Sequence, residues 1–138
     1  MNRLRLEGQL LVDEGLRLKP YRCTAGRLTI GVGRNLDDRG ITESEALVLL
    51  NNDISAFWGQ LAVSQPWVLA APEEVQEALV NMSFNLGLRG LLKFQKTLEH
   101  MRTGQYREAA SAMLDSSWAR QVGARAERLA EQVRRAEG

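Results

Sequence analysis

Side chains that could act as a general acid and as its partner groups lie close together between Asp13 and Arg34. Glu14 stands at the end of a predicted helix, next to Gly15, and strand-like sequence follows it. A carboxyl group at such a junction can be partly desolvated and can then donate a proton near neutral pH. Hydrolysis of a glycosidic bond needs such an acid, and it also needs a second group that activates or orients water on the other face of the sugar.

The composition excludes several other kinds of site. The chain has 138 residues, with one cysteine and one histidine. A single cysteine excludes an internal disulfide and any multi-cysteine zinc site, and a single histidine excludes a His-rich metal centre. The chemistry must therefore come mainly from carboxylates, hydroxyls and one thiol, and we expect neither a metal nor a cofactor.

The charge of the chain is nearly balanced, with 18 basic and 17 acidic residues. Non-specific binding to nucleic acid depends on neutralising phosphates with Lys and Arg, so the balance argues against nucleic acid as the partner. Basic residues gather toward both ends of the chain and acidic residues in its middle. Such asymmetry can favour an anionic polymer on one face of the molecule.

The N-terminal sequence lacks the apolar run of a secretory signal, and no stretch of about 18 apolar residues occurs anywhere. We therefore expect synthesis in the cytoplasm and no stable insertion into a membrane. A target outside the membrane would require another protein to give access to it.

Periodicity and capping residues predict the elements that position the segment around Glu14. A first helix should end near Gly15, and the run 21–33 predicts a small hairpin or three-stranded sheet. Thr42 and Glu45 form a capping box, which predicts a helix over about 43–59. Further helices are predicted from Pro72 to Gly87, over about 91–102, over about 105–115 and over about 123–136.

These elements predict an α+β fold that is mainly α, in one domain over residues 1–138. No linker, repeat or low-complexity tract interrupts the chain. We expect a small β lobe over about 15–42, and we expect the helix over about 43–59 to link it to a helical lobe. The helical lobe should cover about 60–138 and also include the N-terminal helix.

Three motifs carry a family resemblance. The first runs from Glu14 as E-G-x-x-L-x-x-Y, then Cys23, then T-I-G-x-G, so that Glu14, Cys23 and Thr29 are separated by eight and five intervening residues. This pattern and spacing resemble those of the phage-type lysozymes of glycoside hydrolase family 24. The second, 81–87, looks like the family's central-helix segment. The third, 117–126, looks like part of its C-terminal lobe. The resemblance covers nearly the whole chain and implies the two-lobed lysozyme-like fold.

The resemblance implies a muramidase, which hydrolyses the β-1,4 bond between N-acetylmuramic acid and N-acetylglucosamine in bacterial peptidoglycan. Glu14 would be the general acid, and Cys23 and Thr29 would hold or activate the attacking water on the opposite face, as inversion requires. Phe84 and Asn85 match positions on the wall of the cleft. Arg125 matches an arginine that pairs with the catalytic glutamate.

The implied biological role is that of an endolysin, which lyses the host cell. We expect a monomer that needs no cofactor. Since the sequence carries no export signal, a separate holin-type pore would have to open the membrane before the enzyme reaches the wall.

The chain departs from the family pattern at three positions. Many members have aspartate in place of Cys23, and an ordinary thiol is only a few per cent ionised at neutral pH. The thiol is therefore a poorer base than aspartate unless nearby positive charge lowers its pKa, and Arg22 and Arg27 are the candidates for that charge. The family's histidine is replaced by Arg34, which is expected to remove a stabilising ion pair. A threonine of the cleft is replaced by Val122.

Two other functions remain open at this point. A lytic transglycosylase would use the same glutamate but would form an anhydro sugar without water. A non-catalytic wall-binding or nucleic-acid-binding helical module would retain the spacing of the three residues without the activity. The chemical ends of the products distinguish these possibilities.

Overall fold

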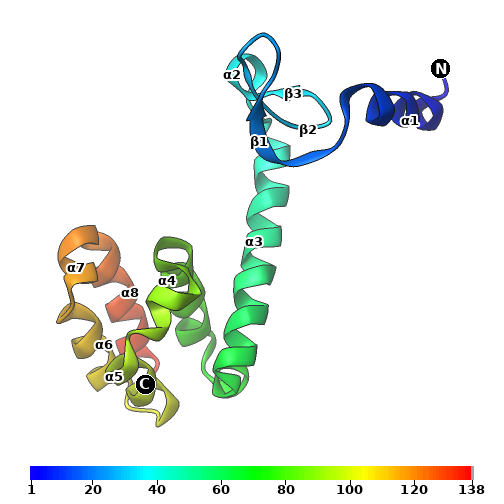
Figure 1. Ribbon diagram of the computed structural model, residues 1–138. Coiled ribbons are helices and arrows are strands. Elements are labelled where there is room, and N and C mark those ends of the chain that lie inside the picture. The colour runs from blue at the N-terminus through cyan, green and yellow to red at the C-terminus, as the bar shows by residue number, and fades with distance from the viewer. Residues whose placement is uncertain (138) are drawn as a thin grey trace. The chain divides into compact units, whose positions relative to one another are not determined.

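The computed structural model describes residues 1–137 and contains eight α-helices, one 3-10 helix and one three-stranded sheet in that part of the chain (Figure 1). The predicted α+β class, mainly α, is confirmed. The backbone forms two compact units, residues 1–49 and residues 50–138. The expected lobe boundaries stay a prediction, and residue 138 lies outside the described residues.

Helix α1, Arg3–Glu14, opens the first unit and carries Glu14 as its last residue. The side chain of Asn2 caps its start by accepting a hydrogen bond from the backbone N–H of Arg5 at 2.9 Å. Gly15 ends it with a positive φ of 77°, a conformation that glycine adopts without steric penalty. The predicted end of the first helix is therefore confirmed.

The sheet of the first unit has the strand order β1-β2-β3, and both pairs are antiparallel. Its strands are β1 (Arg17–Arg22), β2 (Leu28–Gly31) and β3 (Arg34–Asn35). The register places Tyr21 opposite Thr29, so that Cys23, just past β1, lies at the same end of the ladder as the start of β2. Of the two predicted forms, a hairpin or a three-stranded sheet, the sheet is the one present, although it begins earlier, at Arg17, and β3 lies beyond Gly33.

The capping box predicted before the long helix is present. The hydroxyl of Thr42 accepts from the backbone N–H of Glu45 at 3.1 Å, and the carboxylate of Glu45 accepts from the backbone N–H of Thr42 at 2.8 Å. Helix α3, Glu43–Ser64, starts there and extends five residues past the predicted end at 59. A short helix that was not predicted, α2 (Leu36–Arg39), precedes it.

Arg34 forms a two-pronged ion pair with Glu45 in the first unit. Its guanidinium donates to both carboxylate oxygens of Glu45, at 2.8 and 2.7 Å, and to the carbonyl oxygen of Gly40 at 3.2 Å. A two-pronged Arg–carboxylate contact is stronger than a single hydrogen bond between neutral groups. The expectation that arginine at this position removes an ion pair is therefore wrong, because Arg34 has a partner in Glu45.

This contact predicts a pH-dependent contribution to stability. The guanidinium of Arg34, followed by the backbone N–H of Thr42, lowers the pKa of Glu45 to about 2 from its ordinary value of 4.5. A lowered carboxyl pKa stabilises the folded chain above pH 4.5, and this stabilisation is lost as the pH falls toward 2. At neutral pH we expect Glu45→Gln to lower the Tm by about 2–5 °C, as measured by thermal unfolding.

The matched control is Glu43→Gln, which removes a carboxylate from the same helical turn without touching Arg34. The Tm difference between wild type and Glu45→Gln should shrink as the pH is lowered from 4.5 to 2. A difference that stays constant over this range would contradict the ionic origin of the contribution.

The second unit is helical beyond the end of α3. Its elements are the 3-10 helix η1 (Pro66–Ala70), α4 (Glu73–Leu92), α5 (Gln95–Arg102), α6 (Tyr106–Leu114), α7 (Ser117–Val122) and α8 (Ala124–Arg135). Figure 1 shows α5 to α8 grouped with α4. The core between them is apolar, and its largest fully buried side chains include Leu61, Leu79, Met82, Leu91, Met101 and Met113.

Two features of the second unit differ from the predicted helices. Gly87 leaves the helical conformation, with φ of 70°, as its predicted role as a stop implies, but α4 resumes beyond it and the next helix begins at Gln95 instead of 91. No helix was predicted between about 115 and 123, the segment that contains Ser116. Ser116 instead caps α7, because its hydroxyl accepts from the backbone N–H of Ala119 at 3.1 Å.

Candidate active site

Glu14 presents its carboxyl group at the exposed end of α1, where it meets the backbone before β3. A Cβ atom built on Gly33 would lie 2.9 Å from Oε2 of Glu14. The carboxylate therefore lies directly against the Cα of this glycine. The end of the first helix and the turn between β2 and β3 thus meet at the side chain that was predicted to be the acid.

Cys23 and Thr29 come together at the end of the β1–β2 hairpin. The backbone N–H of Cys23 donates to the carbonyl oxygen of Arg27 at 3.0 Å, which closes the turn. The hydroxyl of Thr29 donates to the same carbonyl oxygen at 2.8 Å, so one acceptor anchors both residues. Thr29 is buried and Cys23 is half-buried, so the pair has a fixed position in the hairpin.

The turn lowers the pKa of the Cys23 thiol below its ordinary value. Hydrogen bonds from the backbone N–H of Arg27 and then of Ala25 are the main causes, and partial desolvation opposes them. The lowered pKa favours the thiolate, which is the form of cysteine that accepts a proton.

The predicted source of this effect is wrong. Arg22 and Arg27 were the candidates for lowering the pKa of Cys23 through their positive charge, but their guanidinium groups lie 4.0 and 3.8 Å from the carboxylates of Asp37 and Asp38. Backbone donors in the turn lower this pKa instead.

The single cysteine makes this property directly measurable. We expect the rate of alkylation of Cys23 by iodoacetamide to rise with pH around a midpoint below 9.0, the ordinary thiol value. The same measurement on the unfolded chain is the control and should give the ordinary midpoint. A midpoint in the folded protein at or above that of the unfolded chain would contradict the effect of the turn.

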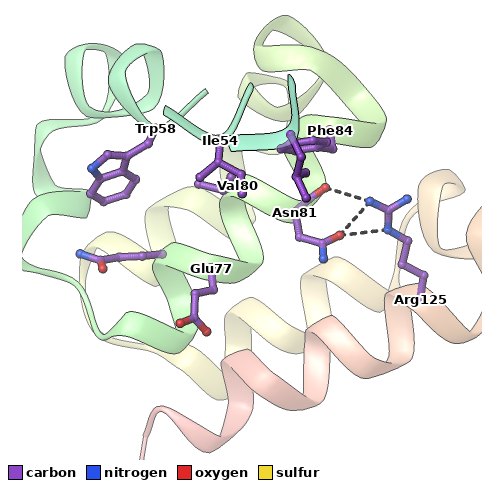
Figure 2. Close-up of a pocket in the computed structure, with 9 residues that line it drawn as sticks. Ile54, Trp58, Glu77, Val80, Asn81, Phe84 and Arg125 are labelled. Carbon is purple, nitrogen blue, oxygen red and sulfur yellow. Dashed lines mark hydrogen bonds between the residues drawn. The ribbon is translucent and has the colours of Figure 1, made fainter. Parts of the chain in front are cut away.

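Phe84 and Arg125, two of the residues implied by the resemblance, line one pocket of the second unit. The pocket has a volume of about 480 Å³. Its walls are formed by Leu50, Ile54, Trp58, Gln76, Glu77, Val80, Asn81, Phe84 and Arg125. Figure 2 shows Phe84 above Asn81 and the guanidinium of Arg125 beside it. The ring of Phe84 also packs on Phe57, with centroids 5.1 Å apart.

Asn81 holds Arg125 in place and was not recognised in the sequence. Arg125 donates to the side-chain oxygen of Asn81 at 3.0 and 2.8 Å and to its backbone oxygen at 3.0 Å (Figure 2). Asn81 stands at the start of the 81–87 motif, but nothing in its residue type indicates an arginine partner from a helix 44 residues away. The pairing of Arg125 with Glu14 that the resemblance implies stays a prediction.

Asn85 does not line this pocket. Its side-chain oxygen accepts a hydrogen bond from the indole N–H of Trp118 at 2.7 Å, and Trp118 is almost fully buried. The contact joins α4 to α7, which gives Asn85 a structural role. The predicted part of Asn85 in substrate binding stays a prediction.

Among residues 1–137, no group of three or more His, Cys, Asp and Glu side chains gathers in a way that could hold a metal ion. No helix of this same stretch is both long and apolar enough to cross a membrane.

Comparison with known proteins identifies the family. The phage lysozyme family model matches residues 12–137. The chain is 31% identical to the pre-baseplate central spike protein of Enterobacteria phage T4, over 85% of this chain but only 25% of that longer protein. It is 27% identical to probable T4-type lysozyme 1 of Dictyostelium discoideum, over 90% of both chains, and 31% identical to the endolysin of Acyrthosiphon pisum secondary endosymbiont phage 1, over 81% of this chain and 77% of that one. The chain therefore belongs to the phage lysozyme family and is a lysozyme-like peptidoglycan hydrolase.

Proposed function

We propose that this chain is a muramidase that hydrolyses the β-1,4 bond between N-acetylmuramic acid and N-acetylglucosamine with inversion of configuration. The observation that carries the proposal is that Cys23 and Thr29 are both anchored to the carbonyl oxygen of Arg27, in the unit that also presents the Glu14 carboxyl group. One acid and one water-holding pair are the two components that an inverting glycosidase needs.

In the proposed mechanism Glu14 protonates the oxygen of the leaving sugar as the glycosidic bond breaks. Thr29 directs its own hydroxyl proton to the carbonyl oxygen of Arg27, which leaves the lone pairs of its oxygen free to accept a hydrogen bond from water. The Cys23 thiolate accepts the second proton of that water while the water oxygen attacks the anomeric carbon. The lowered pKa of Cys23 supports this role, since it increases the fraction of thiolate.

The type of group at position 23 supports inversion. A retaining glycosidase uses a second carboxylate as a nucleophile, about 5 Å from the acid. Here the family's aspartate position holds a cysteine, and the buried hydroxyl of Thr29 is fixed beside it. The Cys23 thiol and the Thr29 hydroxyl can both bind water, which is the nucleophile of an inverting glycosidase.

We also propose how the enzyme reaches its substrate. The name endolysin of a relative supports a role in lysis of the host cell. On this proposal the protein is made in the cytoplasm of the host, acts as a monomer, and reaches peptidoglycan after a separate holin-type pore opens the membrane.

The bond that is cut can be tested by digesting purified peptidoglycan and reducing the products with borohydride. The proposal predicts muramitol as the newly reduced end. N-acetylglucosaminitol would show that the other glycosidic bond is cut, and an anhydromuramic end would instead identify a lytic transglycosylase. Intact peptidoglycan, with binding retained, would identify the non-catalytic module.

A further inference from the structure

Gly33 and Gly31 have the same backbone conformation but different surroundings. Both have φ of +71°, in the left-handed region that favours glycine. A Cβ atom built on Gly31 would meet nothing within 4 Å. One built on Gly33 would lie 2.9 Å from Oε2, 3.0 Å from Cδ and 3.2 Å from Cγ of Glu14. Only Gly33 therefore has a reason to lack a side chain beyond its backbone conformation.

We propose that Gly33 is a positioning residue for Glu14, because the missing side chain leaves the space in which the acid's carboxyl group lies. The inference rests on the proposed role of Glu14 as the general acid. Within residues 1–137 no hydrogen bond or ion pair is found on the Glu14 carboxylate. Contact with the Cα of Gly33 is then what limits where the carboxyl group can lie.

We expect a side chain at position 33 to displace the Glu14 carboxyl group and to leave the fold unchanged. The atoms that it would meet belong to the far end of a flexible, exposed side chain, which can rotate away. A general acid, however, must come within about 2.6–3.2 Å of the oxygen that it protonates. A misplacement of about 1 Å can lower the rate about 10²-fold.

Gly31→Ala is the matched control for Gly33→Ala. Both substitutions impose the same positive φ on an alanine in the same turn, and only the second one displaces Glu14. The experiment measures Tm, kcat and KM of both variants of the full chain with purified peptidoglycan, alongside Glu14→Gln. We expect similar losses of Tm and similar KM values, and we expect kcat of Gly33→Ala to be about 10²-fold below that of Gly31→Ala.

A second pair, Gly33→Asn and Gly31→Asn, repeats the comparison with a residue that tolerates positive φ better than alanine does. Equal kcat values for the Gly33 and Gly31 variants would overturn the proposal. The proposal expects the Glu14 side chain to rotate away from a new side chain at position 33 and the fold to survive. Unfolding of both Gly33 variants while the Gly31 variants fold would therefore also overturn it.

Glu14→Gln separates this inference from the function on which it rests. If Glu14→Gln is inactive and the Gly33 and Gly31 variants have equal kcat values, the positioning role is rejected and the proposed muramidase activity is retained. An active Glu14→Gln would reject the proposed acid and, with it, the role of Gly33.

Discussion

Replacement of Glu14 with Gln is expected to lower the rate of peptidoglycan hydrolysis by about 10²–10⁴-fold, the usual contribution of a general acid. Gln has nearly the same shape as Glu but has no proton to give to the leaving oxygen. The substitution should leave the structure intact, because the side chain is exposed and glutamine needs no more room beside Gly33 than glutamate does. Release of soluble fragments from purified peptidoglycan measures the rate.

The stability of Glu14→Gln should be equal to that of the wild type or slightly higher. Glu14 is the last residue of α1, where the partial negative charge of the helix end disfavours a carboxylate. Glu7→Gln is the matched control, since it removes an exposed carboxylate from the middle of the same helix. Wild-type rates of hydrolysis in both Glu14→Gln and Glu7→Gln would reject Glu14 as the acid. Lower rates in both variants would indicate that the negative charge of α1 matters, and not the proton of Glu14.

Replacement of Thr29 with Val is expected to lower the rate about 10²-fold, with a smaller change in stability. Valine keeps the branched shape that suits strand β2, but it removes the oxygen that we propose to hold the attacking water. It also removes the hydrogen bond from this hydroxyl to the carbonyl oxygen of Arg27, a contact whose loss should cost about 1 kcal/mol.

Thr24→Val is the control for this prediction, because Thr24 lies in the turn of the same hairpin but is exposed. The assay measures kcat and KM on peptidoglycan together with the free energy of unfolding. A rate loss fully explained by unfolding at the assay temperature, or equal losses in both variants, would contradict a role of Thr29 in holding water.

Local signals allowed the part of the fold around the site to be predicted from the sequence. The capping box of Thr42 and Glu45 depends on side chains three residues apart, and Gly15 ends α1 through its own conformation. The spacing of Cys23 and Thr29 across a tight hairpin brings them together in one unit by chain geometry alone. In each case the residues that interact are close in sequence.

The features that the sequence did not predict depend on contacts that residue types do not encode. Arg34 and Glu45 are 11 residues apart, and helix α2 lies between them in the sequence. Their ion pair was not predicted because it depends on the path of the chain through this helix. The lowered pKa of Cys23 comes from backbone N–H groups, which every residue has, and not from the two arginines that stood out. Helix α7 was missed because its start combines a serine cap with a buried tryptophan and lacks a long apolar repeat.

The central claim, that water held opposite Glu14 attacks the muramic acid carbon, is tested most directly by digestion of purified peptidoglycan in H₂¹⁸O. Mass spectrometry of the first products gives the isotope content, and NMR taken before mutarotation gives the anomer. Our account predicts one ¹⁸O atom at the new muramic acid end and the α-anomer, the product of inversion at a β bond. The β-anomer, or an anhydro end without ¹⁸O, would contradict it.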